Sequence, residues 1–321
     1  MTKCTMLGET DRQVHFAFPR SWFILLPLLF IFLSCATLSP LDSSPEKPLA
    51  AALPQAVIPK WRAFAKSETD GLAYFAGKTA RPRLEFWALR IDLEAPELRI
   101  VVKGGADGGN TQLSTKVSSF VRDNGLLAGI NALPFDPVSG REGEPRVNVG
   151  IVVADGVQVS PPHRGYDALV WYWENGAAIV PQSEILAPQT IVNAVGGFRQ
   201  ILEQGAVSER TLQLTSRHPR SAAGISPDRR YLYLLVIDGR RPGSAGSTEA
   251  ETALLLRALG AYDGINFDGG GSSALALRYP DGKIRAVNTP IHGLVPGRER
   301  AVAGCLGVTV NTQTENSNEN R

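Results

Sequence analysis

The sequence predicts an α+β fold: a single strand-rich domain of mixed or antiparallel sheets with a few flanking helices. Short apolar runs recur through the body of the 321-residue chain. Several are separated by turn sequences such as Ser226-Pro227-Asp228-Arg229, a pattern typical of hairpins. Clear helical spacing occurs in two segments, and many hairpins with few helices indicate an α+β protein.

The expected elements follow in chain order. In the first helix Val117, Phe120 and Val121 share a face, and Gly125 follows as a C-terminal cap. In the second, Thr248 and Glu251 form a capping box. We expect strands at 84–93, 98–102, 126–131, 169–173, 262–267 and 301–310, hairpins at 148–153/157–160, 220–225/231–237 and 274–278/283–288, and helices at 111–124 and 247–259.

The N-terminus predicts export. Lys3, Arg12 and Arg20 precede an apolar run at 22–33, which is shorter than the roughly 20 residues of a membrane-spanning helix. This pattern is typical of a signal peptide at residues 1–35. The end of the run resembles a bacterial lipoprotein cleavage site, so Cys35 is the predicted lipidation site, which places the protein in the cell envelope as a membrane-anchored lipoprotein. An ordinary cleaved signal and an uncleaved anchor are the alternatives.

The remaining chain divides into three parts. Residues 36–80 are rich in Pro, Ala and Ser near their start and predict a tether and lead-in; the domain spans 81–311, and 312–321 form a polar, disordered tail. A net charge of +2 with mixed signs gives no basic stripe for nucleic acid. The histidines and the body's single cysteine, Cys305, lack metal-ligand spacing, so we expect no metal and no cofactor.

One motif carries the most chemical information: Asn266-Phe267-Asp268-Gly269-Gly270-Gly271-Ser272-Ser273. A short buried strand delivers the Asp268 carboxylate into three glycines and two hydroxyls. Consecutive glycines let successive backbone N–H groups point into one anion-binding concavity. The motif therefore predicts a site for a sugar, a phosphate or both, with a tight turn as the alternative.

Other polar residues stand at the ends of expected strands, where loops project side chains from a rigid support. Taken singly, each is more often a cap, a turn residue or a surface charge. Together they form the candidate set Asn131, Asp136, Arg220, Asp238, Arg240, Asn288 and Arg298.

Three blocks in this order resemble the phosphodiester glycosidase family, which includes the mannose 6-phosphate uncovering enzyme (N-acetylglucosamine-1-phosphodiester alpha-N-acetylglucosaminidase) and bacterial exopolysaccharide-related members. They span Leu113 to Asp136, His218 to Arg240, and Leu259 to Ser273. Asn288 and the segment from Arg298 to Val308 also fit. The sequence departs from the family at Ala132-Leu133-Pro134, where two glycines are usual, so we expect side chains where backbone would approach the ligand.

The resemblance implies hydrolysis of a sugar-1-phosphodiester at the glycosidic bond, which releases the sugar and leaves a phosphomonoester. Arginine matches phosphate oxygens with a fixed fork of donors, and carboxylates serve glycoside cleavage. Asp268 is the first choice for nucleophile or base, with Asp238, Asp136 and, more weakly, Glu249 as alternatives. The remaining assignments are phosphate binding by Arg220 and Arg298 with Gly269, Gly270, Gly271 and Ser272; orientation of the sugar or of the loops by Asn131, Asn266 and Asn288; and further substrate contacts by Arg240 and Ser273.

Two other classes of protein fit the sequence. One is a non-catalytic envelope lipoprotein that binds a glycan in the same cleft. The other is a purely structural lipoprotein in which the glycines form only a turn. Convergence of Arg220 and Arg298 on Asp268 would count against the structural class.

Overall fold

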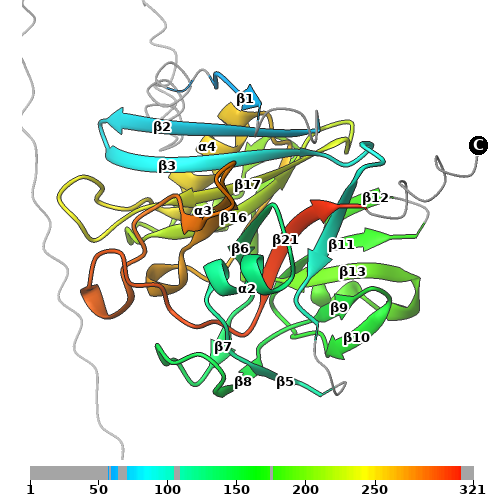
Figure 1. Cartoon of the computed structure of the whole chain (residues 1–321). Coiled ribbons are helices and arrows are strands. Elements are labelled where there is room, and N and C mark those ends of the chain that lie inside the picture. The colour runs from blue at the N-terminus through cyan, green and yellow to red at the C-terminus, as the bar shows by residue number, and fades with distance from the viewer. Residues whose placement is uncertain (1–56, 58, 64–70, 105–108, 174–175, 312–321) are drawn as a thin grey trace, which may run out of the picture. The chain divides into compact units, whose positions relative to one another are not determined.

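The computed structural model describes residues 57, 59–63, 71–104, 109–173 and 176–311 (Figure 1). All of these belong to one compact unit, Ser43–Arg321. The expected signal peptide, Cys35, most of the tether and the tail at 312–321 lie outside the described residues. None of the described helices is both long and apolar enough to cross a membrane.

An eight-stranded sheet forms the first layer of the fold, in the order β1-β2-β3-β17-β16-β18-β14-β15. Part of the expected lead-in belongs to it, because residues 72–80 form β2, which lies beside β3 (Figure 1). The strands are β1 (Arg62–Ala63), β2 (Leu72–Ala80), β3 (Arg83–Asp92), β14 (Arg199–Glu203), β15 (Ala206–Val207), β16 (Arg220–Ile225), β17 (Tyr231–Ile237) and β18 (Asp263–Asn266).

Three smaller sheets complete the strand structure. The first has the order β10-β9-β13-β11-β12, the second β20-β19-β6-β21-β4 and the third β5-β8-β7. Their strands are β4 (Leu98–Val102), β5 (Thr111–Leu113), β6 (Ala128–Asn131), β7 (Phe135–Asp136), β8 (Pro145–Asn148), β9 (Val152–Ala154), β10 (Val157–Ser160), β11 (Asp167–Tyr172), β12 (Gly176–Pro181), β13 (Ile191–Gly196), β19 (Leu275–Arg278), β20 (Ile284–Ala286) and β21 (Cys305–Val310).

Helices are few and short in the described chain. The α-helices are α2 (Val117–Asp123), α3 (Glu209–Leu212) and α4 (Glu249–Leu259), and the 3₁₀ turns are η1 (Gln182–Glu184), η2 (Pro188–Thr190), η3 (Gly270–Ser272) and η4 (His292–Leu294). Thr248 and Glu251 form the expected capping box at the start of α4, and Gly260 ends it at φ 114°. The strand-rich α+β prediction is confirmed, and every pair of named strands among the described residues is antiparallel.

Several expected boundaries differ from the structure, since β21 begins only at Cys305 rather than at residue 301, and two of the differences change the kind of element. The segment expected to be helical from residue 111 begins as strand β5, and the helix starts only at Val117, because Thr111–Leu113 pairs with β8. The strand expected at 148–153 is broken, because Gly150 adopts φ 124° between β8 and β9. In both places pairing with a distant strand or a local turn outweighs the apolar pattern.

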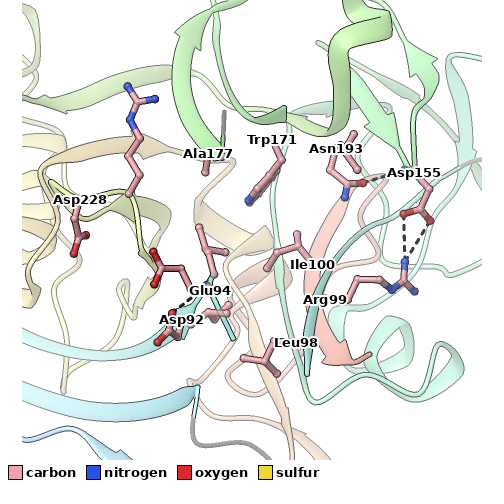
Figure 2. A pocket seen from close by; sticks show the side chains of 15 residues that line it. Asp92, Glu94, Leu98, Arg99, Ile100, Asp155, Trp171, Ala177, Asn193 and Asp228 are labelled. Carbon is pink, nitrogen blue, oxygen red and sulfur yellow. Dashed lines mark hydrogen bonds and ion pairs between the residues drawn. The ribbon is translucent and has the colours of Figure 1, made fainter. Parts of the chain in front are cut away.

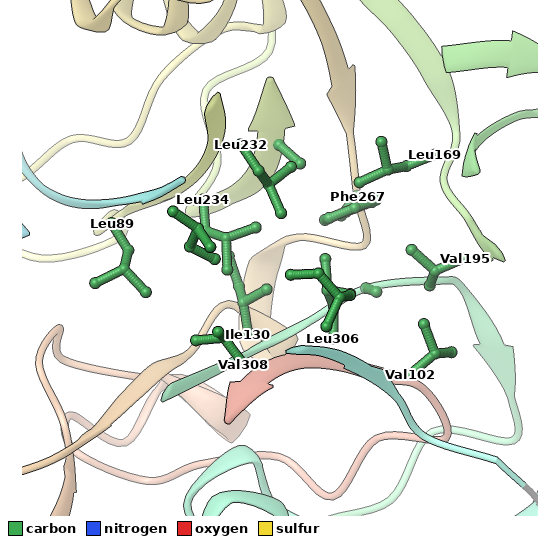
Figure 3. Packing of buried hydrophobic residues seen from close by; sticks show 14 of the residues in the cluster. Leu89, Val102, Ile130, Leu169, Val195, Leu232, Leu234, Phe267, Leu306 and Val308 are labelled. Atoms are coloured by element: carbon green, nitrogen blue, oxygen red, sulfur yellow. The ribbon is translucent and has the colours of Figure 1, made fainter. Parts of the chain in front are cut away.

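The main apolar core lies between the sheets (Figure 3). It joins Leu232 and Leu234 of β17, Ile130 of β6 and Leu306 of β21, and it extends to Leu169 of β11. On the other face of the eight-stranded sheet, the leucines of α4 pack against β16 and β17. Strands β16 and β17 are therefore buried on both faces, which explains their continuous apolar sequence.

Strand register brings three candidate segments to one edge of the eight-stranded sheet. Arg220, which begins β16, pairs with Ile237, which ends β17, and Ala222 pairs with Asn266, which ends β18. Because β16 runs antiparallel to both neighbours, its start meets both of their ends. The loops that begin at Asp238 and at Phe267 therefore leave the sheet beside Arg220.

The segment that departs from the family pattern turns into the core. Ala132 and Leu133 are fully or almost fully buried and belong to the main apolar cluster. A Cβ atom at Gly304 would overlap the Leu133 side chain. The side chains that replace two glycines here thus fill space next to Gly304, which corrects the expectation that they would stand where backbone approaches a ligand.

We expect Gly304→Ala to lower the free energy of unfolding by about 1–3 kcal/mol, because its methyl group overpacks Leu133. Leu133→Ala alone should cost about 2–5 kcal/mol through the cavity that it leaves. In the double variant the smaller side chain makes room for the new methyl, so the combined cost in a denaturant titration should be clearly less than the sum. Strict additivity would contradict this packing.

Candidate functional site

The Asp268 backbone is fixed to the neighbouring strand β6. Its N–H donates to the Ala132 carbonyl (2.7 Å), and its carbonyl accepts from Asn131 Nδ2 (2.6 Å). The fully buried Asn131 also uses its Oδ1 to accept from Ser221 Oγ (2.6 Å) and from the Ala274 N–H (3.1 Å). One side chain thus joins β6, β16 and both ends of the triple-glycine loop.

The three glycines are needed because neighbouring groups approach the backbone closely. A Cβ at Gly269 would lie 2.8 Å from the Pro219 carbonyl oxygen, and one at Gly271 would lie 2.5 Å from Arg300 Nη2. Gly270 has φ 63°, a conformation that favours glycine, and its Cβ would lie 3.2 Å from Arg240 Nη2. The loop is therefore more than a tight turn, because two guanidinium groups lie against its backbone.

Asp268 as a whole residue is half-buried, and burial of its carboxyl group raises the pKa to about 6. Hydrogen bonds from the Ser272 hydroxyl and the Gly269 backbone N–H, together with the Arg300 charge, partly offset that increase. A carboxyl group with such a pKa changes its charge close to neutral pH. Perturbed acids of this kind are concentrated at functional sites.

Arg300 lies at the same site and contacts both Ser272 and His292. Its Nη1 donates to Ser272 Oγ (3.1 Å) and its Nε donates to His292 Nδ1 (3.1 Å). Burial and then the nearby Arg300 and Arg298 lower the His292 pKa, which favours the neutral ring that can accept. Neither Arg300 nor His292 was predicted from the sequence, although Arg300 is only two residues from the predicted Arg298.

Arg240 is the second guanidinium at the glycine loop. It is exposed, and its Nη2 lies 3.2 Å from His218 Nδ1. Because an arginine can only donate, this ring nitrogen accepts. Burial and then the charges of Arg220 and Arg240 lower the His218 pKa, which again favours a neutral ring. Each of these two arginines therefore has a neutral histidine beside it.

Arg220 is more buried than we expect for a side chain that binds a ligand. It is 8% exposed, and its three nitrogens donate to the carbonyls of Ser247 (3.1 Å) and Ser216 (3.0 Å) and to Glu249 Oε1 (3.3 Å). The other Glu249 oxygen lies 3.3 Å from Arg199 Nε. Arg220 and Glu249 thus form a buried ion pair behind the loop, at the first turn of α4.

Asp238 lies in the interior and is 1% exposed. Its oxygens accept from Arg241 Nε (2.9 Å), Asn288 Nδ2 (3.1 Å) and the Thr289 N–H (3.0 Å). Asn288 also donates to the Ser273 carbonyl (3.0 Å). Asp238 and Asn288 therefore fasten the segment after β20 to the end of the triple-glycine loop.

Two buried polar atoms of the motif have no hydrogen-bond partner within the described chain: Asn266 Oδ1 and Ser273 Oγ. Buried polar groups are usually satisfied, so these two atoms are exceptions within the motif. Asp136 and Arg298 are both exposed. A Cβ at Gly140, just beyond Asp136, would lie 2.7 Å from His292 Nε2 and 3.3 Å from Arg298 Nη2, so this loop borders the site on the Arg298 side.

The charge balance favours an anion. Arg300 acts on the Asp268 carboxylate and Arg240 lies against the loop at Gly270, while Arg298 lies beside His292 and Arg220 is paired with Glu249 behind the loop. Of the two phosphate-binding arginines expected from sequence, Arg298 borders the site and Arg220 is paired with Glu249. Among the described residues no group of three or more His, Cys, Asp or Glu side chains is placed to hold a metal ion.

Fold and site together define an antiparallel α+β protein with one acid among cationic side chains on a glycine loop. Residues 124–309 match the phosphodiester glycosidase family, whose members are hydrolases acting on phosphodiester glycosides. Because the match covers more than half of the chain, the chain belongs to this family. No curated protein matches the chain in sequence.

Several solved structures are similar in fold, among them the following two. One is the catalytic domain of zebrafish N-acetylglucosamine-1-phosphodiester alpha-N-acetylglucosaminidase, auto-inhibited by its pro-peptide, with 18% identity, a TM-score of 0.58 and coverage of 79% of this chain and 88% of that one. The other is a hypothetical protein from Synechocystis, with 16% identity and a TM-score of 0.56. That match covers 76% of this chain but only 63% of the Synechocystis protein's length.

We expect Gly271→Ala to weaken anion binding while leaving the fold intact. The new methyl would take the place of the Arg300 guanidinium, which is flexible enough to move away but would then leave Ser272. Inorganic phosphate should raise the melting temperature of the wild type, because a ligand that binds the native state stabilises it. The rise should be clearly smaller in Gly271→Ala and unchanged in Gly109→Ala, since a Cβ at Gly109 meets nothing within 4 Å. Equal shifts in all three proteins would contradict the proposed contact.

Proposed function

We propose that this protein is an exported hydrolase that cleaves the glycosidic bond of sugar-1-phosphodiesters in a glycan, releasing the sugar and leaving a phosphomonoester. Family membership supports the reaction class. The observation that carries the proposal for this chain is a single glycine loop that places the Asp268 carboxylate beside the Arg300 guanidinium and has the Arg240 guanidinium against its backbone at Gly270. Export and a lipid anchor at Cys35 stay predictions from the sequence.

The phosphate is assigned to the cationic side of the loop. Arg300 and Arg240 present forked donors whose geometry matches phosphate oxygens. The neutral rings of His292 and His218 accept from them and hold their orientation without adding a charge of their own. A phosphodiester leaving group carries its own negative charge, so stabilising that charge as the bond breaks would lower the barrier.

Asp268 is assigned to the anomeric carbon, as nucleophile or as the base that activates water. Its backbone is held by Asn131 and Ala132, which limits how far the carboxylate can move. The internal contacts of Asp238 make it a weaker candidate for the reacting acid, because Arg241, Asn288 and Thr289 already occupy its oxygens. Asn266 and Ser273 supply open polar atoms for sugar hydroxyls.

We expect Asp268→Asn to reduce sugar release from a panel of sugar-1-phosphodiesters by at least about 10³-fold, because removal of a reacting carboxylate typically costs that much. Free sugar and new phosphomonoester are measured together. Asp123→Asn, which removes an exposed carboxylate from α2, is the matched control and should keep wild-type turnover. Retained turnover in Asp268→Asn, or loss only in Asp136→Asn, would overturn the assignment. Glycan binding without release by the wild type would identify a binding protein instead.

We expect kcat/KM to rise with pH through an apparent pKa of about 6. Burial raises the Asp268 pKa to about 6, and both of its possible roles need the ionised form, which grows as pH increases past that value. Initial rates from about pH 4.5 to about pH 8 at low substrate concentration test this, with folding followed by circular dichroism at each pH. A flat profile across that range would contradict ionised Asp268 as the reacting group.

A further inference from the structure

A cavity of about 530 Å³ shares no lining residue with the site described above, and Figure 2 shows the side chains that line it. One wall comes from the end of β3, the start of β4 and the turn between them. The opposite wall comes from the sheet that contains β11, β12 and β13, and the turn between β16 and β17 closes a third side. The volume falls within the range of small-molecule sites, roughly 300–1,000 Å³.

The inner wall is a row of three cross-strand neighbours. Trp171 of β11 pairs with Ala177 of β12 on one side and with Asn193 of β13 on the other. Directly paired residues in antiparallel strands project from the same face of the sheet. The small Ala177 leaves open space beside the indole, and Figure 2 shows Trp171 reaching between Ala177 and Ile100.

This wall offers hydrogen-bond donors in an apolar setting. Trp171 is 8% exposed, and its Nε1 is buried without a hydrogen-bond partner in the described chain. Asn193 uses Oδ1 to accept from the Asp155 N–H (3.0 Å), so the part of its amide left for a ligand is the NH₂ donor. Ile91, Leu98 and Ile100 line the same space. An unpaired buried donor is unfavourable, and a ligand oxygen would satisfy it.

Unlike the apolar inner wall, the rim of the cavity is lined by charged side chains. Four carboxylates line it, those of Asp92, Glu94, Asp155 and Asp228, together with the guanidinium groups of Arg99 and Arg229. A third guanidinium, that of Arg230, is ion-paired with Asp92 (2.7 Å) and Glu94 (3.6 Å). Arg99 Nη1 is bound to the Asp155 carboxylate (3.2 Å), and Glu94 is 70% exposed. The remaining excess of one negative charge disfavours an anion, and the donors on the inner wall disfavour a cation. A purely apolar ligand would leave the indole N–H unpaired.

We propose that this cavity binds one ring of a neutral saccharide. A sugar ring has C–H faces that suit Ile91, Leu98 and Ile100. Its hydroxyl oxygens can accept from Trp171 and Asn193, while other hydroxyls donate to Glu94 at the rim. This binding is independent of hydrolysis at Asp268, and it gives the protein a second contact with a glycan.

The test uses the full chain labelled with ¹⁵N-tryptophan. The sequence has five tryptophans, and the Trp171 indole signal is identified by its loss in Trp171→Phe. Methyl glycosides of glucose, galactose, mannose and N-acetylglucosamine are titrated to about 50 mM, which covers the weak affinities of single sugar rings. Glucose 1-phosphate and cyclohexanol serve as the anionic and the apolar comparison.

At least one neutral glycoside should shift the Trp171 signal saturably. Glu94→Ala, a change at an exposed position, should weaken that binding about fivefold, as expected for one lost hydrogen bond. Asp268→Asn should bind equally well, which separates this site from the proposed reaction. Absence of any glycoside shift, an equal shift with glucose 1-phosphate or cyclohexanol, or loss of the shift in Asp268→Asn would each overturn the inference.

Discussion

The site depends on the way in which Asn131 fixes the Asp268 backbone to the sheet. This fully buried side chain makes hydrogen bonds to Asp268, Ser221 and Ala274, so one amide sets the position of the loop's beginning relative to its end. Each partner is a polar group that would be costly to leave unpaired in the interior. The carboxylate that follows β18 is therefore held by the core rather than by a free surface loop.

Because Asp268 is fixed to the core, its carboxyl group has an unusual electrostatic environment. Burial raises the Asp268 pKa to about 6, because the loss of solvation outweighs the lowering effects of the Ser272 hydroxyl, the Arg300 charge and the Gly269 N–H. Behind the loop, Arg220 and Glu249 neutralise each other in the interior. Breaking such a pair by removing one partner is strongly unfavourable, so the pair holds the start of β16 against the first turn of α4.

Short sequence patterns correctly predicted those elements that are determined by interactions between residues close together in the chain. The ranges of β16 and β17 and the caps of α4 follow from apolar runs, a turn with proline and a capping box. The approach of Arg220, Asp238 and Asp268 to one sheet edge follows from the antiparallel register of three adjacent strands. The selection of Arg300 rather than Arg298 as the neighbour of Ser272 could not be predicted, because it depends on the path of an irregular loop around His292. The cavity at Trp171 could not be predicted from the sequence either, because its walls come from segments widely separated in the chain.

The most direct test of this account is a crystal structure of Asp268→Asn with an uncleaved sugar-1-phosphodiester. The account predicts that the phosphate lies against Arg240 and Arg300, with the anomeric carbon facing residue 268 and a sugar hydroxyl within reach of Asn266 or Ser273. A phosphate bound away from both arginines, or a sugar whose anomeric carbon faces Asp136 or Asp238 instead, would contradict it.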